Sequence, residues 1–144
     1  RFFSSFLLLF LVAAAAQWAN ICSSQPETKI RGCDTKGCGG YNQPRGARRH
    51  GGVDVVCEDG STVHALFMGR TDQRTRPYGN AIDDEVQLSG EGFCIKMFYI
   101  KPVKSSGPIR KGENIGVLLP MQSVYRGITS HVQNHDFTDP TPYL

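Results

Sequence analysis

The sequence predicts an all-β domain, and two observations support this prediction. Short segments rich in β-branched and aromatic residues recur along the chain, separated by Gly, Pro, Asn and Asp. Beyond the first residues, no segment shows the sustained apolar period of 3.6 residues that an amphipathic helix requires. With 144 residues the chain has room for one domain, which we expect to span residues 17–144.

Residues 1–16 are expected to be a signal peptide. Arg1 precedes an apolar run of 11 residues, from Phe6 to Ala16, that ends in small residues. This run is too short to cross a bilayer, whereas a basic start, an apolar centre and a small-residue end are typical of a secretory signal. We therefore expect a secreted, extracellular protein without membrane insertion.

The first half of the domain is expected to contain two strands. Residues 18–21 form an N-terminal segment, and residues 23–49 are rich in Gly, Ser, Pro, Asn and Gln, which indicates loops and turns. Residues 53–57 are apolar and β-branched and predict a strand. A turn of the Asp-Gly type then leads into a second strand, residues 62–67.

The second half alternates between strands and connections. Charged residues, Pro and Gly over residues 70–81 predict a loop, whereas the alternation of residues 85–89 predicts a strand. Residues 93–100 are dense in aromatic and β-branched residues and give the strongest strand signal. Residues 101–114 are expected to form a connection and residues 115–119 a short strand. A last strand is expected to carry His131 and Val132, and residues 136–144 to form a tail.

The formal net charge is +3, which is mildly basic. The cations form two local clusters: Arg45, Arg48 and Arg49, and Lys101, Lys104, Arg110 and Lys111. Each cluster could meet sulfated glycans or an acidic receptor surface, or could be a solvated loop. Because no aromatic residues are interleaved with the cations, we expect no nucleic-acid partner.

Five cysteines are present, and in a secreted chain they should form disulfides. Counting alone leaves fifteen frameworks open, each with one free thiol. The short Gly-containing loop from Cys33 to Cys38 suits a local bridge, and a bridge from Cys22 to Cys57 would then leave Cys94 unpaired. A zinc–cysteine site is not expected, because the chain has no C-x-x-C pair.

The stretch His50-Gly51-Gly52-Val53-Asp54 is a candidate metal motif. In an extended segment, residues an even number apart share a face, so His50 and Asp54 would point the same way. An imidazole nitrogen and a carboxylate oxygen can then both reach one divalent ion, each at roughly 2.0–2.2 Å. The glycines allow the backbone to bend or bulge. The alternative is an exposed His beside a surface Asp.

Several runs of residues resemble the leukocyte cell-derived chemotaxin 2 family. They are Trp18-Ala19-Asn20-Ile21-Cys22, the loop from Cys33 to Gly39, His50-x-Gly52-Val53-Asp54-Val55, residues 92–102, Lys111-Gly112-Glu113 with Gly116, Ser130-His131-Val132 and residues 139–144. That family looks like a secreted vertebrate offshoot of the lysostaphin/LytM-type zinc metallopeptidases. The resemblance implies a compact antiparallel β-sheet or barrel-like core with long loops.

The resemblance also implies which cysteines pair. It implies bridges between Cys22 and Cys57 and between Cys33 and Cys38. Relatives carry, near their C-terminus, a cysteine that pairs with the counterpart of Cys94, and this chain lacks it. Cys94 is therefore expected to be unpaired.

By resemblance, zinc is held by the His and Asp of H-x-x-x-D, here His50 and Asp54, and by the second His of a C-terminal H-x-H. Here that motif reads His131-x-Gln133, and a neutral amide is a poor zinc ligand beside an imidazole. His135 shares strand parity with Gln133 but lies about 7 Å further along the strand, so a backbone shift is needed for it to ligate. His131 is the other candidate for the third ligand.

We expect no catalytic residue. Active peptidases resemble the chain around Tyr99 but carry a catalytic His two positions on, where this chain has Lys101. A lysine stays charged near neutral pH and cannot act as a neutral imidazole does. Because Lys101 and Gln133 stand where a catalytic His and a ligand His are expected, we expect a non-catalytic relative. The resemblance implies a protein that is chemotactic for leukocytes and binds cell-surface receptors. The alternatives are an active zinc endopeptidase cleaving Gly-rich or peptidoglycan peptides, and a module that binds glycans or bacterial surfaces.

Overall fold

The computed structural model describes residues 17–75, 82, 84–103, 106–135 and 139–144. The described chain is all-β, as predicted, with antiparallel pairing between the named strands and no α-helix among these residues. The expected signal peptide, residues 1–16, lies outside them. Among the described residues, no helix has the length and apolar character needed to cross a membrane.

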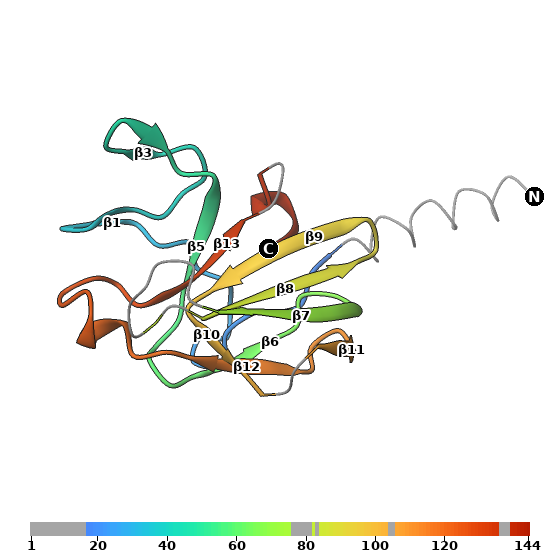
Figure 1. The fold of residues 1–144 in the computed structure, drawn as a ribbon. Coiled ribbons are helices and arrows are strands. Elements are labelled where there is room, and N and C mark those ends of the chain that lie inside the picture. The colour runs from blue at the N-terminus through green and yellow to red at the C-terminus, as the bar shows by residue number, and fades with distance from the viewer. Residues whose placement is uncertain (1–16, 76–81, 83, 104–105, 136–138) are drawn as a thin grey trace, which may run out of the picture.

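A six-stranded antiparallel sheet forms the centre of the molecule (Figure 1). Its order is β11-β7-β8-β9-β13-β5. The strands are β5 (Gly52–Val56), β7 (Gly69–Thr75), β8 (Asp84–Gly90), β9 (Phe93–Phe98), β11 (Gly107–Ile109) and β13 (His131–His135).

A smaller, three-stranded sheet has the order β10-β12-β6. Two short hairpins, β1 with β2 and β3 with β4, project from one end of the molecule (Figure 1). The strands are β6 (Thr62–His64), β10 (Ile100–Pro102), β12 (Asn114–Leu118), β1 (Cys33–Asp34), β2 (Gly37–Cys38), β3 (Pro44–Arg45) and β4 (Arg48–Arg49). Two 3₁₀ turns complete the fold, η1 (Met121–Ser123) and η2 (Thr141–Tyr143).

The alternation seen in the sequence places the core. Val86 and Leu88 on β8 and Ile95 and Met97 on β9 are almost fully buried, whereas Lys96 between the last two is exposed. Burial of apolar side chains on one face is what stabilises a sheet of this kind.

Two of the predicted connections contain strands. Residues 70–81 are predicted as a loop, but residues 69–75 form β7, paired with β11 on one side and β8 on the other. The backbone hydrogen bonds of this strand need no apolar residues, and Arg70 and Asp72 point outward, so the composition conceals it. Residues 101–114, predicted as one connection, contain the end of β10 and all of β11.

The strand predicted over residues 93–100 is interrupted at Tyr99. This residue has a φ of 72°, in the left-handed region, and it turns the chain from β9 into β10 of the smaller sheet. Its backbone is held on both sides, because its N–H donates to Asp84 O and its carbonyl accepts from Leu119 N, both at 2.9 Å. Tyr99 is therefore the corner between the two sheets.

The structure contains the disulfides Cys22–Cys57 and Cys33–Cys38, and Cys94 is a free, half-buried thiol.

Residues 136–138 of the predicted tail lie outside the described part. Residues 139–144 pack onto the domain, because the ring of Tyr143 stacks on Trp18 at a centroid distance of 5.1 Å. Trp18 N also donates to Tyr143 O at 3.0 Å, which joins the two ends of the described chain.

Candidate functional site

The candidate site lies where β5 and β13 run side by side. Their register places Gln133 opposite Asp54 and His135 opposite Gly52. His131, Gln133 and His135 alternate along β13 and therefore share one face. The spacing of His50 and Asp54 predicts that they share a face, and the structure places His50 Nε2 3.3 Å from Asp54 Oδ1.

Gly52 allows β13 to approach β5 closely. A Cβ atom at this position would overlap the carbonyl oxygen of Asn134 and the ring of His135. The imidazole of His135 occupies the space that a side chain at position 52 would need. It makes edge contacts with the rings of His50 and Phe98, at centroid distances of 5.6 and 5.0 Å.

Two arginines hold the fully buried carboxylate of Asp54. Arg31 donates to Asp54 Oδ2 at 2.7 Å and Arg45 donates to the same oxygen at 2.9 Å. The backbone N–H of Arg31 also donates to the carbonyl of Asp54 at 2.8 Å, which explains how a residue distant in sequence reaches the site. Burial alone would raise the pKa of Asp54, but the neighbouring His50, His131 and Arg31 outweigh it and hold the pKa below its usual value.

Burial makes the imidazoles of His131 and His135 weaker bases than a free imidazole. His131 Nδ1 lies 2.7 Å from the carbonyl oxygen of Thr129, and its Nε2 lies 3.3 Å from Asp54 Oδ2. Burial lowers the pKa of His131. Burial, followed by the neighbouring His50, lowers the pKa of His135 to about 4.

Gln133 lies between Tyr99 and His135. The Tyr99 hydroxyl donates to Gln133 Oε1 at 3.1 Å. Gln133 Nε2 lies 2.7 Å from His135 Nε2, and because an amide nitrogen can only donate, the imidazole nitrogen accepts. Both ends of the amide are therefore engaged, and the lone pair of His135 Nε2 is used.

Two atoms of the cluster have the properties of metal ligands. His50 Nε2 and Asp54 Oδ1 are buried and have no hydrogen-bond partner. His50 Nδ1 lies 3.1 Å from the carbonyl of Gly40, and donation to that oxygen leaves a lone pair on Nε2. A metal-bound imidazole is usually held in this way.

The third ligand is not in place. Gln133 and His135 are hydrogen-bonded to each other, and the Asp54 oxygen that faces His131 already receives two guanidinium groups, whose charge opposes a cation. Among the residues that the structure describes, no group of three or more His, Cys, Asp or Glu side chains could hold a metal. The cluster therefore does not fit the zinc site expected from His50, Asp54 and His135.

A cavity of about 220 Å³ opens beside this cluster. It is lined by Arg31, Lys36, Arg45, Tyr99, Tyr125, Ile128, His131 and Gln133. Lys101 does not line it, but lies exposed on β10 with Val117 as its cross-strand partner. Sequence reasoning missed Arg31, because no local pattern links it to Asp54.

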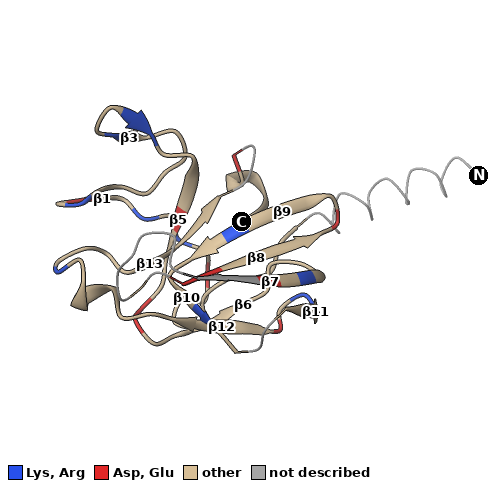
Figure 2. Ribbon diagram, in the orientation of Figure 1, with Lys and Arg blue, Asp and Glu red and all other residues tan. Residues whose placement is uncertain are grey.

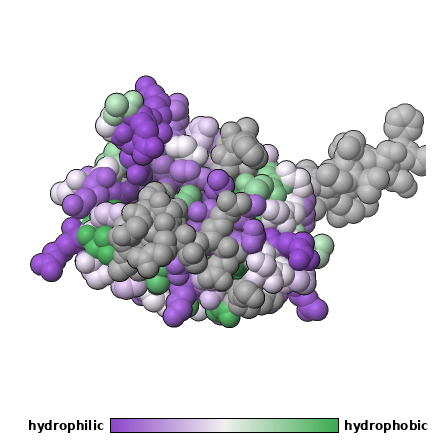
Figure 3. All heavy atoms as spheres, in the orientation of Figure 1, coloured by the Kyte–Doolittle hydropathy of each residue, from purple (hydrophilic) through white to green (hydrophobic). Residues whose placement is uncertain are grey.

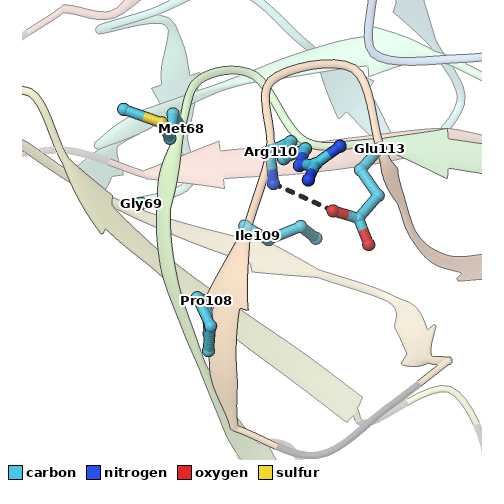
Figure 4. A pocket seen from close by; sticks show the side chains of 6 residues that line it. All are labelled: Met68, Gly69, Pro108, Ile109, Arg110 and Glu113. Carbon is cyan, nitrogen blue, oxygen red and sulfur yellow. Dashed lines mark hydrogen bonds between the residues drawn. The ribbon is translucent and has the colours of Figure 1, made fainter.

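A more open groove of about 600 Å³ lies along β11 (Figure 4). None of the residues predicted as ligands lines it. Met68 and Ile109 supply apolar surface, and the backbone N–H of Arg110 donates to Glu113 Oε1 at 2.9 Å. Among the side chains drawn there, Arg110 and Glu113 are the charged ones, and none is an imidazole (Figure 4).

Comparison with known proteins identifies the family, although no protein-family model matches the chain. Leukocyte cell-derived chemotaxin-2 of Mus musculus is 54% identical over 92% of this chain and 90% of its own length. The protein of the same name from Bos taurus is 53% identical over the same shares. Myeloid protein 1 of Gallus gallus is 50% identical over 90% of this chain and 42% of its own length. At this identity and coverage, the chain belongs to the leukocyte cell-derived chemotaxin-2 family.

Proposed function

We propose that the protein is a secreted, non-catalytic chemotactic signal that binds a receptor on the surface of leukocytes. One observation carries this proposal: more than half of the aligned residues are identical in mammalian proteins named leukocyte cell-derived chemotaxin-2, and the alignments cover 92% of this chain and 90% of each relative.

Two features support secretion. Residues 1–16 have the pattern of a secretory signal. The Cys22–Cys57 and Cys33–Cys38 disulfides suit an oxidising compartment, because such bridges are rare in cytosolic proteins.

The site supports a role without catalysis on a scaffold related to the lysostaphin/LytM-type peptidases. A zinc hydrolase needs three protein ligands, an open position for water and a group that moves a proton. The third ligand is missing opposite Asp54, and Lys101 is exposed on another sheet. We therefore assign no reaction step to these residues, and their role is to hold the loops around the cavity in place.

Migration of leukocytes toward the purified oxidised protein tests the proposal. We expect dose-dependent migration that a zinc chelator does not change. The rival endopeptidase is tested in parallel by release of peptides from casein or peptidoglycan. Absence of migration, or hydrolysis that the chelator abolishes, would refute the proposed function.

A further inference from the structure

The positive charge of the protein is concentrated in the two projecting hairpins. Residues 31–52 contain five Lys and Arg residues and one acidic residue, a net charge of +4, whereas the whole chain carries +3. The rest of the chain is therefore slightly acidic. Figure 2 shows Lys and Arg on the β1–β2 and β3–β4 hairpins, at one end of the molecule.

Only part of this charge is neutralised within the protein. Arg31 pairs with Asp34 and Asp54, and Arg45 also pairs with Asp54, so these cations and both carboxylates are used internally. Lys36, Arg48 and Arg49 are exposed, and within the described part of the chain no ion pair is found for them. These three residues form what we call the basic hairpin surface.

The basic hairpin surface is held rigid. The Cys33–Cys38 disulfide closes the first hairpin. Arg45 Nη2 donates to the carbonyl of Cys38 at 2.9 Å, which ties the second hairpin to the first. Arg49 Nη1 donates to the carbonyl of Asn42 at 3.1 Å. These contacts fix the backbone of both hairpins and the side chain of Arg49, so less conformational entropy is lost when an anionic partner binds.

We propose that the basic hairpin surface docks a sulfated glycan chain. This inference rests on the proposed function, because a secreted protein meets such glycans outside the cell. Charge complementarity favours a polyanion.

The composition of the surface separates a glycan from other polyanionic partners. A protein interface buries an apolar centre, but the large exposed apolar residues of the described chain, Met68 and Val103, lie elsewhere. A nucleic acid needs exposed rings for base stacking, and Tyr41, the aromatic residue of this segment, is half-buried.

Heparin is the probe, and the measurement is its Kd at two salt concentrations together with the salt needed for elution from a heparin column. The double variant Arg48→Ala/Arg49→Ala should weaken binding about tenfold. The single variant Lys36→Ala should weaken it to a smaller extent. The control Lys96→Ala/Lys101→Ala removes two cations that are also exposed but lie on β9 and β10, and it should change the Kd less than about twofold.

Equal losses of heparin affinity in the Arg48→Ala/Arg49→Ala variant and in the control variant would overturn the assignment of binding to the basic hairpin surface. Competition by single-stranded DNA of matched charge as strong as that by heparin, or equal binding of desulfated heparin, would overturn the glycan assignment. Thermal unfolding of each variant checks that the fold is intact. Wild-type protein that attracts leukocytes without binding heparin would refute this inference alone, whereas loss of migration refutes the proposed function.

Discussion

Gln133 on β13 lies directly opposite Asp54 on β5, and its amide oxygen accepts a hydrogen bond from the Tyr99 hydroxyl. Across the strands the two side chains share a face, so the residue at position 133 decides whether a third donor joins His50 and Asp54. The amide of Gln133, hydrogen-bonded to Tyr99 and His135, lies where a third ligand is needed. A metal at this site would therefore have two protein donors.

Replacing Gln133 with His should therefore create a zinc site. The new imidazole would face Asp54 and the free nitrogen of His50, and zinc affinity should rise at least about tenfold over wild type. Competition with a chromogenic chelator measures the affinity. Gln133→Asn, which keeps an amide, is the matched control. Wild-type protein that retains one zinc per chain through chelator dialysis would contradict this prediction.

Removing the charge of Asp54 should strongly destabilise the fold. Asp54→Asn removes the buried carboxylate partner of Arg31, whose side chain is 1% exposed, and leaves its guanidinium paired with Asp34 alone. Breaking a buried pair costs about 3–5 kcal/mol. Asp34→Asn is the control, because Asp34 is more exposed at 15% and its loss should cost less. Urea denaturation gives both free energies of unfolding, and equal losses would be inconsistent with the role assigned to Asp54.

Stability should fall in acid as His135 is protonated. Its pKa is lowered in the folded protein from 6.5 to about 4, so the unfolded chain binds a proton first as the pH falls. Its contribution is complete above about pH 6.5 and is lost on descent toward pH 4, when the imidazole can no longer accept from Gln133. Denaturant midpoints across this range measure the decline, which His135→Gln should reduce. An NMR titration that places the pKa of His135 near 6.5 in the folded protein would contradict this prediction.

The unfolded, oxidised protein should contain a single reactive thiol. Cys94 is free in the structure, and the other four cysteines form the two disulfides. Reaction with a thiol reagent in denaturant counts the free groups, and Cys94→Ser should abolish the signal. A count of zero or three would mean that the disulfide pattern is different.

The all-β class and most strands follow from local sequence, because burial on one face leaves an alternating pattern. β7 escaped prediction because its hydrogen bonds do not depend on apolar side chains. The proximity of His50 and Asp54 was also predictable from their spacing, although His50 lies before β5 and the chain bends at Gly51 between them. Arg31 and the engagement of His135 with Gln133 were not, because both depend on contacts between distant segments that no spacing encodes.

The backbone hydrogen bond from Trp18 to Tyr143 brings the first and last described segments of the chain into direct contact. A short linker could therefore close the polypeptide into a ring without disturbing the sheets. New ends could then be opened at the exposed Gly46–Ala47 tip of the second hairpin, which would give a circular permutant with free termini beside the arginines.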